Sequence, residues 1–247
     1  MRFLQAWSSY FKENRLSQQN IPWEADDVLA SEEALLIGKS IAAFQLGEYS
    51  EGRELLKAAA EYSRSLGDHL LFEITQLFIK EEQHHALLLK RFMLSHGIPL
   101  LRKHWTDTVF RRLRKHFNYE LSITVLITAE ITSLVYYKAL KNCTASKVLQ
   151  SICDKILLDE RAHVKYESEL IHYLRGLKPG AYRLVIGLLH RFLFLGTVVV
   201  VYFDHRKVFA KGGYGCIRFW KSSWSEFSGC FSRTEARLKK TLQASAR

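Results

Sequence analysis

Proline is scarce in this sequence, with only three among 247 residues, while hydrophobic residues make up 48%. Proline interrupts helices, so its scarcity favours a compact, mostly helical protein. The four cysteines, Cys143, Cys153, Cys216 and Cys230, lack C-x-x-C or other metal spacing, which argues against a thiolate zinc site. These scattered cysteines, and a first segment too poor in apolar residues for a secretory signal, predict a reducing cytoplasm.

The length of the chain allows one domain with a substantial core. Apolar stripes at helical spacing, separated by glycine, asparagine and proline, predict an all-α fold. We expect an irregular N-terminal lead-in at residues 1–30, a four-helix bundle at 31–176, and C-terminal helices at 177–247 that pack on the bundle. The expected bundle helices span about 31–66, 69–96, 119–141 and 145–174, with a linking helix near 101–114.

Acidic residues are fewer than basic ones, 25 against 36, which gives a net charge of +11. Basic residues cluster at 111–116, 206–207 and 237–240. Such clusters form either solvated helix faces or a surface for an acidic partner, namely tRNA, an acyl carrier protein or an anionic membrane surface. Charge alone does not choose among these partners, and no DNA partner is expected.

Residues 184–203 form an apolar run about as long as a bilayer is thick. His190 and Arg191 interrupt the run near its middle, where charge is costly in a membrane. We therefore expect a fifth helix that covers the bundle. The expected location is the cytoplasm, with peripheral attachment to a membrane as the alternative.

Two short segments share one pattern, an acid followed by Glu-x-x-His, at residues 81–85 and 159–163. Residues three apart share a helix face, so Glu82 lies beside His85, and Glu160 beside His163. Isolated pairs of this kind are common by chance, but these two lie on apolar stripes where leucine would be expected. Buried carboxylates and imidazoles are costly unless they are paired or bind metal. The two pairs together therefore predict a metal centre between helices.

Two further carboxylates complete a repeat. Glu130 lies in a strongly apolar helix, 30 residues before Glu160, and Glu51 lies 31 residues before Glu82. This near-equal spacing indicates an internal repeat of a helical hairpin. Glu48 is the alternative to Glu51, because both lie on the same stripe, and the repeat spacing favours Glu51.

With these residues the chain resembles the ferritin-like di-iron carboxylate superfamily, over roughly residues 31–175. That family uses one Glu from each of two helices and Glu-x-x-His from each of the other two. The matching positions are Glu51, Glu82, His85, Glu130, Glu160 and His163. By similarity to the ribonucleotide reductase small subunit and multicomponent monooxygenases, the resemblance implies that Asp159 holds His85 and that Glu81 holds His163. The length and helix plan are also similar to aldehyde-deformylating oxygenases and to the tRNA hydroxylase branch.

Four carboxylates and two imidazoles suit two iron ions, with manganese as the alternative, and not structural zinc. An apolar pocket beside the metals is expected from stripe residues Phe44, Phe78, Ile127, Leu134 and Tyr137, and no catalytic residue is assigned beyond the ligands. The resemblance implies a non-haem di-iron oxidase or oxygenase that uses O2 on an apolar or carrier-bound organic substrate. A non-enzymatic, metal-handling ferritin-like protein and a tRNA-modifying hydroxylase are the alternatives.

Overall fold

The described part of the chain is helical and contains no strand, which confirms the predicted all-α class. The computed structural model describes residues 2–16, 20–24, 27–49, 52–105 and 118–245, and side chains as far as residue 231. The helices are α1 (Arg2–Leu16), α2 (Ser31–Glu48), α3 (Arg53–Leu66), α4 (Leu70–Ser95), α6 (Tyr119–Cys143), α7 (Lys147–Gly176), α8 (Gly180–Lys211) and α9 (Cys216–Ser245).

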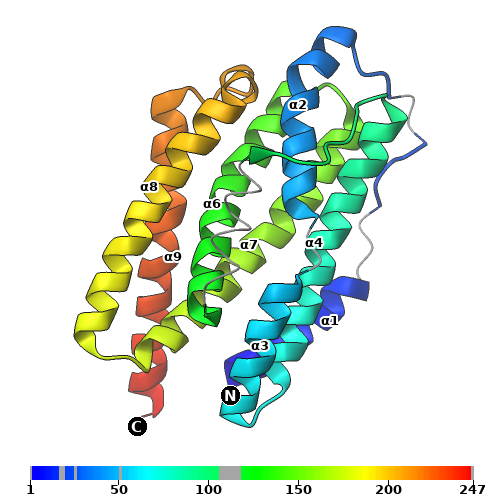
Figure 1. The fold of residues 1–247 in the computed structure, drawn as a ribbon. Helices are drawn as coiled ribbons and strands as arrows, with labels where there is room; N and C mark the ends of the chain where they lie inside the picture. Colours follow the sequence, from blue (N-terminus) through cyan, green and yellow to red (C-terminus); the bar gives the residue numbers. More distant parts are fainter. Residues whose placement is uncertain (1, 17–19, 25–26, 50–51, 106–117, 246–247) are drawn as a thin grey trace.

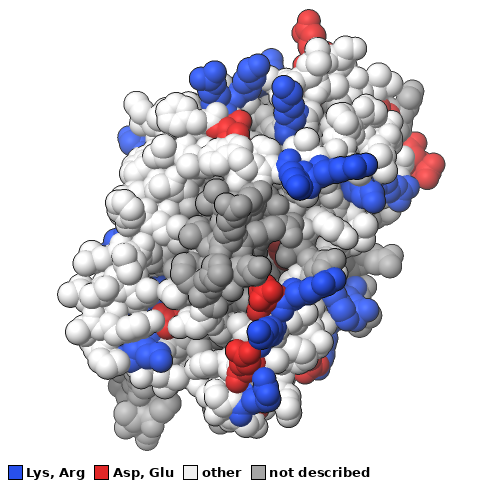
Figure 2. All heavy atoms as spheres, viewed as in Figure 1, with Lys and Arg blue, Asp and Glu red and all other residues white. Residues whose placement is uncertain are grey.

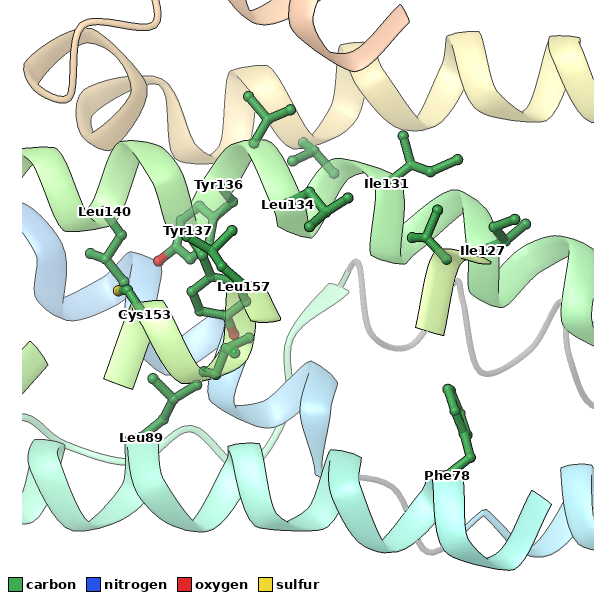
Figure 3. Packing of buried hydrophobic residues seen from close by; sticks show 14 of the residues in the cluster. Phe78, Leu89, Ile127, Ile131, Leu134, Tyr136, Tyr137, Leu140, Cys153 and Leu157 are labelled. Atoms are coloured by element: carbon green, nitrogen blue, oxygen red, sulfur yellow. The ribbon is translucent and has the colours of Figure 1, made fainter. Parts of the chain in front are cut away.

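The centre of the molecule is formed by α4, α6 and α7 together with α2 and α3 (Figure 1). Helix α6 packs most extensively against α7 and next against α8. Large side chains that are fully buried on α6, among them Tyr136 and Tyr137, fill the space between these helices. Figure 3 shows Phe78 and Leu89 of α4 pointing toward this α6–α7 layer. The core therefore lies between α4, α6 and α7, and α6 is buried on nearly all sides.

Residues 31–66 do not form the single helix that the sequence analysis expects. Helix α2 ends at Glu48, and α3 begins at Arg53. Between them Gly52 has a left-handed backbone with φ of 62°, and a Cβ atom there would lie 2.4 Å from Cδ1 of Ile79. Only glycine adopts this conformation readily and leaves room for Ile79. The break thus follows from close packing against α4, which helical periodicity does not reveal.

The N-terminal lead-in, expected to be irregular over residues 1–30, is instead helical over residues 2–16. Helix α1 packs on α4 through the buried side chains Leu4, Trp7 and Phe11, which recur at helical spacing. The Phe11 ring lies 5.9 Å from the imidazole of His163, and Trp7 Nε1 donates a hydrogen bond to Glu169 Oε2. Helix α1 is therefore part of the core beside α4 and α7.

The other predicted helices agree closely with α4, α6 and α7. Asn118 and Ser146 are the N-cap residues of α6 and α7. Each side chain accepts a hydrogen bond from the backbone N–H three residues later. The expected linking helix near 101–114 falls mostly on residues 106–117, outside the described part of the chain.

Helix α8 extends beyond the predicted apolar run 184–203 at both ends and packs along α6 and α2. His190, predicted to interrupt the run, is buried, and its Nε2 lies 3.1 Å from Thr128 Oγ1. By length and composition, α6 and α8 are the described helices that could cross a membrane, which is weak support for either doing so. The apolar window of α6 is 83% buried and that of α8 only 33%. Helix α6 is therefore a core helix, whereas α8 leaves much of its apolar surface uncovered.

Candidate metal centre

Acidic and histidine side chains from four helices converge at the centre of the bundle. Glu48 comes from α2, Glu82 and His85 from α4, Glu130 from α6, and Glu160 and His163 from α7. They form two groups, Glu48, Glu82, His85 and Glu160, and Glu82, Glu130 and His163, and within each group one ligand atom per residue lies within 4.8 Å of the others. Glu82 belongs to both groups. The described residues thus contain a cluster of Glu and His side chains that could hold metal ions.

Five of the six residues expected as ligands lie in this cluster: Glu82, His85, Glu130, Glu160 and His163. The sixth, Glu51, lies outside the described residues. Its alternative, Glu48, is buried in the cluster at the last residue of α2. Between these two alternatives, Glu48 is therefore the one that the structure places in the cluster.

The Nε2 atom of each histidine contacts a carboxylate on the other Glu-x-x-His helix. His85 Nε2 lies 2.9 Å from Asp159 Oδ2, and His163 Nε2 lies 2.8 Å from Glu81 Oε2. These are the two pairings that the resemblance implies. A carboxylate accepts a hydrogen bond from Nε2–H, which fixes the ring and turns Nδ1 toward the cluster. Both histidines are fully buried, so each ring has little room to leave this orientation.

Two residues that the sequence analysis missed support these carboxylates. Asn14 Nδ2 of α1 donates to Glu81 Oε1 at 2.9 Å and to Asp159 Oδ1 at 3.0 Å. Lys155 Nζ, one turn before Asp159, lies 2.6 Å from both Asp159 oxygens. The sequence did contain a signal for Asn14, since Leu4, Trp7, Phe11 and Asn14 follow one another at steps of three and four.

The polar atoms that face the cluster have no hydrogen-bond partner in the described part of the protein. They are Nδ1 of His85 and of His163, and carboxylate oxygens of Glu82, Glu130 and Glu160. His163 Nδ1 is 3.0 Å from Glu82 Oε1 without hydrogen-bond alignment, and His85 Nδ1 is 3.7 Å from Glu82 Oε1 and from Glu160 Oε1. Buried polar atoms are rarely left unpaired. Unpaired nitrogen and oxygen lone pairs that converge on one point fit a cation better than a protein–protein hydrogen bond.

Burial and mutual repulsion govern protonation in the cluster. Burial, together with neighbouring acids, raises the pKa of Glu48, Glu130 and Glu160 well above the usual value. Burial would also raise the pKa of Glu82, but His163 and His85 beside it outweigh burial and lower that pKa. Without a cation, burial and repulsion therefore favour the protonated form of these three carboxyl groups. Divalent metal would take the place of those protons.

For His163 and Asp159, partners outweigh the effect of burial on the pKa. Burial would lower the pKa of His163, but the hydrogen bond to Glu81 and the negative charge of nearby Glu82 raise it well above its usual value. Burial would raise the pKa of Asp159, but His85, Lys155 and Asn14 hold it well below its usual range. Asp159 is thus a permanent anion that keeps the His85 ring oriented at neutral pH.

Two further polar side chains adjoin the cluster. Tyr137 Oη donates a 2.6 Å hydrogen bond to Glu48 Oε1. Glu167, one turn after His163 and fully buried, adds negative charge that raises the pKa of Glu130. Glu167 lies on the predicted α7 stripe, yet the resemblance assigns it no role, so sequence reasoning passed over a fifth nearby carboxylate.

A cavity of about 160 Å³ borders the acids. Its polar end includes Glu48, Glu82, Glu130 and Glu160, and its apolar wall includes Phe44, Leu55, Phe78, Ile79, Val125, Leu126 and Val201. Of the five side chains expected to form a pocket, Phe44 and Phe78 line this cavity. Ile127, Leu134 and Tyr137 do not, because they face the packed core between α6 and its neighbours (Figure 3). The apolar periodicity of α6 identifies its buried face but does not show which of these residues border the cavity.

No protein-family model, curated protein or solved structure matches this chain. The case for a metal centre therefore depends on the residues and their arrangement. A helical bundle with a central Glu/His cluster fits a ferritin-like di-iron site.

Proposed function

We propose that this protein is a ferritin-like di-iron oxidase or oxygenase that uses O2 to oxidise an apolar organic molecule in the cavity beside the cluster. One observation carries the proposal: unpaired Nδ1 atoms of His85 and His163 face unpaired carboxylate oxygens at the polar end of an apolar cavity. A purely structural cluster would need these atoms to bond one another.

The ligands would be Glu48, Glu82, His85, Glu130, Glu160 and His163. Glu82 belongs to both groups, so its carboxylate would help to hold the metal at either one. Two divalent cations balance four carboxylates, which removes the repulsion that otherwise keeps protons in the cluster. Oxygen-rich ligands with two imidazoles suit iron, with manganese as the alternative.

The protein itself supplies orientation of the ligands and an apolar surface for the substrate. Asp159 and Glu81 hold the imidazoles by Nε2, so each Nδ1 stays directed at the centre. Tyr137 holds one oxygen of Glu48 and restricts its rotation. The apolar cavity wall favours an apolar substrate. A pair of ferrous ions, when bound, supplies the electrons that reduce O2.

The test starts with anaerobic loading of the purified protein with Fe(II), followed by addition of O2 in the presence of small molecules extracted from cell lysate. Mass spectrometry then searches for a product that has gained one oxygen atom or lost two hydrogens. The matched control is the His85→Ala/His163→Ala variant. The proposal predicts a product that requires iron, O2 and both histidines.

Other outcomes separate the alternatives. Iron uptake and oxidation without any organic product would favour a metal-handling ferritin-like protein. A product found only on added tRNA, and lost when salt weakens RNA binding, would favour a tRNA-modifying hydroxylase. A product formed equally by the double-histidine variant would overturn the assignment of this site.

A further inference from the structure

Helix α8 has apolar side chains on two opposite faces. One face, which includes Ile186, Phe194 and Val201, is buried against the bundle. The other is exposed to solvent and consists of Leu184, Val185, Leu188, Leu189, Phe192, Val199 and Phe203. Phe192 is 77% exposed. A soluble surface helix normally places polar residues on its outer face, so the exposed apolar face of α8 indicates a partner.

The adjoining surface of α9 continues this apolar face. Ile217, Trp220 and Trp224 of α9 are exposed, and the Trp224 ring lies 6.1 Å from Phe194 of α8. Ten of the nineteen large hydrophobic side chains exposed in the described chain lie on α8 and α9. We call these ten residues the α8–α9 face. Their concentration on two neighbouring helices distinguishes the face from scattered surface hydrophobics.

The charge around this face is net positive. Residues 180–231 contain seven Lys or Arg and only two Asp or Glu. Arg183, Arg191, Arg206 and Lys207 of α8 are exposed. The acid of α9, Glu226, is paired with Lys138 of α6 at 2.8 Å. In Figure 2 the side of the molecule over α8, at the left, is mostly uncharged with a few basic side chains at its margins.

We propose that the α8–α9 face docks on the surface of an anionic lipid bilayer, with α8 lying in the plane of the interface. Apolar side chains would enter the boundary between headgroups and acyl chains, while the basic side chains would contact acidic headgroups. Trp220 and Trp224 have the amphipathic rings that favour this boundary. A second copy of this chain fits less well, because it would bring two positive surfaces together.

The packing of α8 also opposes a membrane-spanning arrangement. His190 contacts Thr128 of α6, and His205 Nδ1 lies 2.8 Å from Ser40 Oγ of α2. A spanning α8 would have to break these buried contacts or bring the bundle into the bilayer. Docking on the surface leaves them intact. The helix that would lie on the membrane also lines the cavity with Val201.

The test is flotation of the full-length protein with phosphatidylcholine vesicles that contain phosphatidylglycerol, compared with phosphatidylcholine vesicles alone. Leu188→Ser/Phe192→Ser removes apolar surface from the face. The matched control, Leu35→Ser/Leu87→Ser, changes equally exposed side chains on α2 and α4. We expect the wild type and the control to float with anionic vesicles, and the α8 variant to bind about tenfold more weakly. Arg206→Glu/Lys207→Glu should weaken binding to anionic vesicles too.

Several results would overturn the proposal. One is absence of flotation with anionic vesicles, and another is equal binding by the α8 variant and the control. A dimer that Leu188→Ser/Phe192→Ser converts to monomer, without vesicle binding, would assign the face to a second copy. Retention in cell membranes after an alkaline carbonate wash would indicate a span. Circular dichroism of each variant excludes loss of helix as the cause.

Discussion

Glu48 and Glu130 both lie in the proposed metal centre, one in each helical hairpin, but the helices that carry them differ. Glu130 lies in the middle of α6, an unbroken helix of 25 residues buried on nearly all sides. Glu48 is the last residue of α2, and a break that includes the left-handed Gly52 separates it from α3. The cavity borders this break, since Gly47, Glu48, Gly52 and Leu55 all line it. The half of the site on α6 and α7 thus carries its carboxylate within an unbroken helix, whereas the half on α2 and α4 carries it beside a break, and both halves line the cavity.

The largest expected effect concerns the Glu-x-x-His histidines, which both halves of the site contain. His85→Ala and His163→Ala should each remove most of the bound iron, because each imidazole is held at Nε2 and offers only Nδ1. Helix content should remain near that of the wild type, since the core is large. Iron analysis and circular dichroism measure both. His84→Ala, an exposed neighbour of His85, is the control. Wild-type iron content in either variant would mean that the two halves are not equivalent.

Glu48 and Glu51, three residues apart, test whether the two halves of the site differ in the position of their carboxylate. Glu48→Gln should lower the affinity for iron by about tenfold or more, because Glu48 lies in the cluster. Glu51→Gln should leave the affinity close to that of the wild type. Competition with a chelator of known affinity for Fe(II) measures both. The reverse ranking would restore the regular repeat spacing and assign the ligand role to Glu51.

A smaller effect is expected where α1 connects the two halves. Asn14→Ala removes the hydrogen bonds to Glu81 and to Asp159 and should lower iron affinity by roughly tenfold. Asn14→Asp should be at least as harmful, because it adds a negative charge between two carboxylates. Asn20→Ala, at an exposed position outside the helices, is the control. Unchanged affinity in Asn14→Ala would show that the carboxylates hold the histidines without support from α1.

The last effect is on stability and not on iron affinity, and it concerns the packing of α8 against α6. Burial, with Arg175 and Arg191 nearby, lowers the pKa of His190 to about 3. As pH falls below about 6.5, the unfolded state takes up a proton that folded His190 does not, so stability is lost. Between pH 7 and pH 5, the wild type should lose roughly 2 kcal/mol more unfolding free energy than His190→Gln.

Urea unfolding at both pH values gives the two free energies. His69→Gln, at an exposed histidine before α4, is the control and should follow the wild type. Equal pH dependence in the wild type and His190→Gln would show that His190 does not stabilise the α8–α6 contact in its neutral form.

The sequence predicted those parts of the protein that depend on periodicity within a helix. The class of fold, the course of α4, α6 and α7, and the convergence of Glu82, Glu130 and Glu160 all follow from residues that share a helix face. The break before α3 could not be predicted, because it depends on the contact between Gly52 and Ile79, which is distant in sequence. The cavity wall was only partly predicted for the same reason.

Helix α1 was missed for a different reason. Its stripe of Leu4, Trp7, Phe11 and Asn14 was readable in the sequence, but its polar last member was not recognised as part of the site. Tertiary hydrogen bonds to Glu81 and Asp159 give Asn14 its role, and nothing in local spacing indicates these partners.

The number and location of bound iron ions test the proposed dinuclear centre most directly. After anaerobic loading with Fe(II) and removal of excess iron, anomalous diffraction at the iron edge counts and places the ions in crystals of the loaded protein. We expect two ions per chain. Both should lie among the side chains of Glu48, Glu82, His85, Glu130, Glu160 and His163. A single ion, or ions bound only elsewhere, would contradict a dinuclear centre built between the two halves.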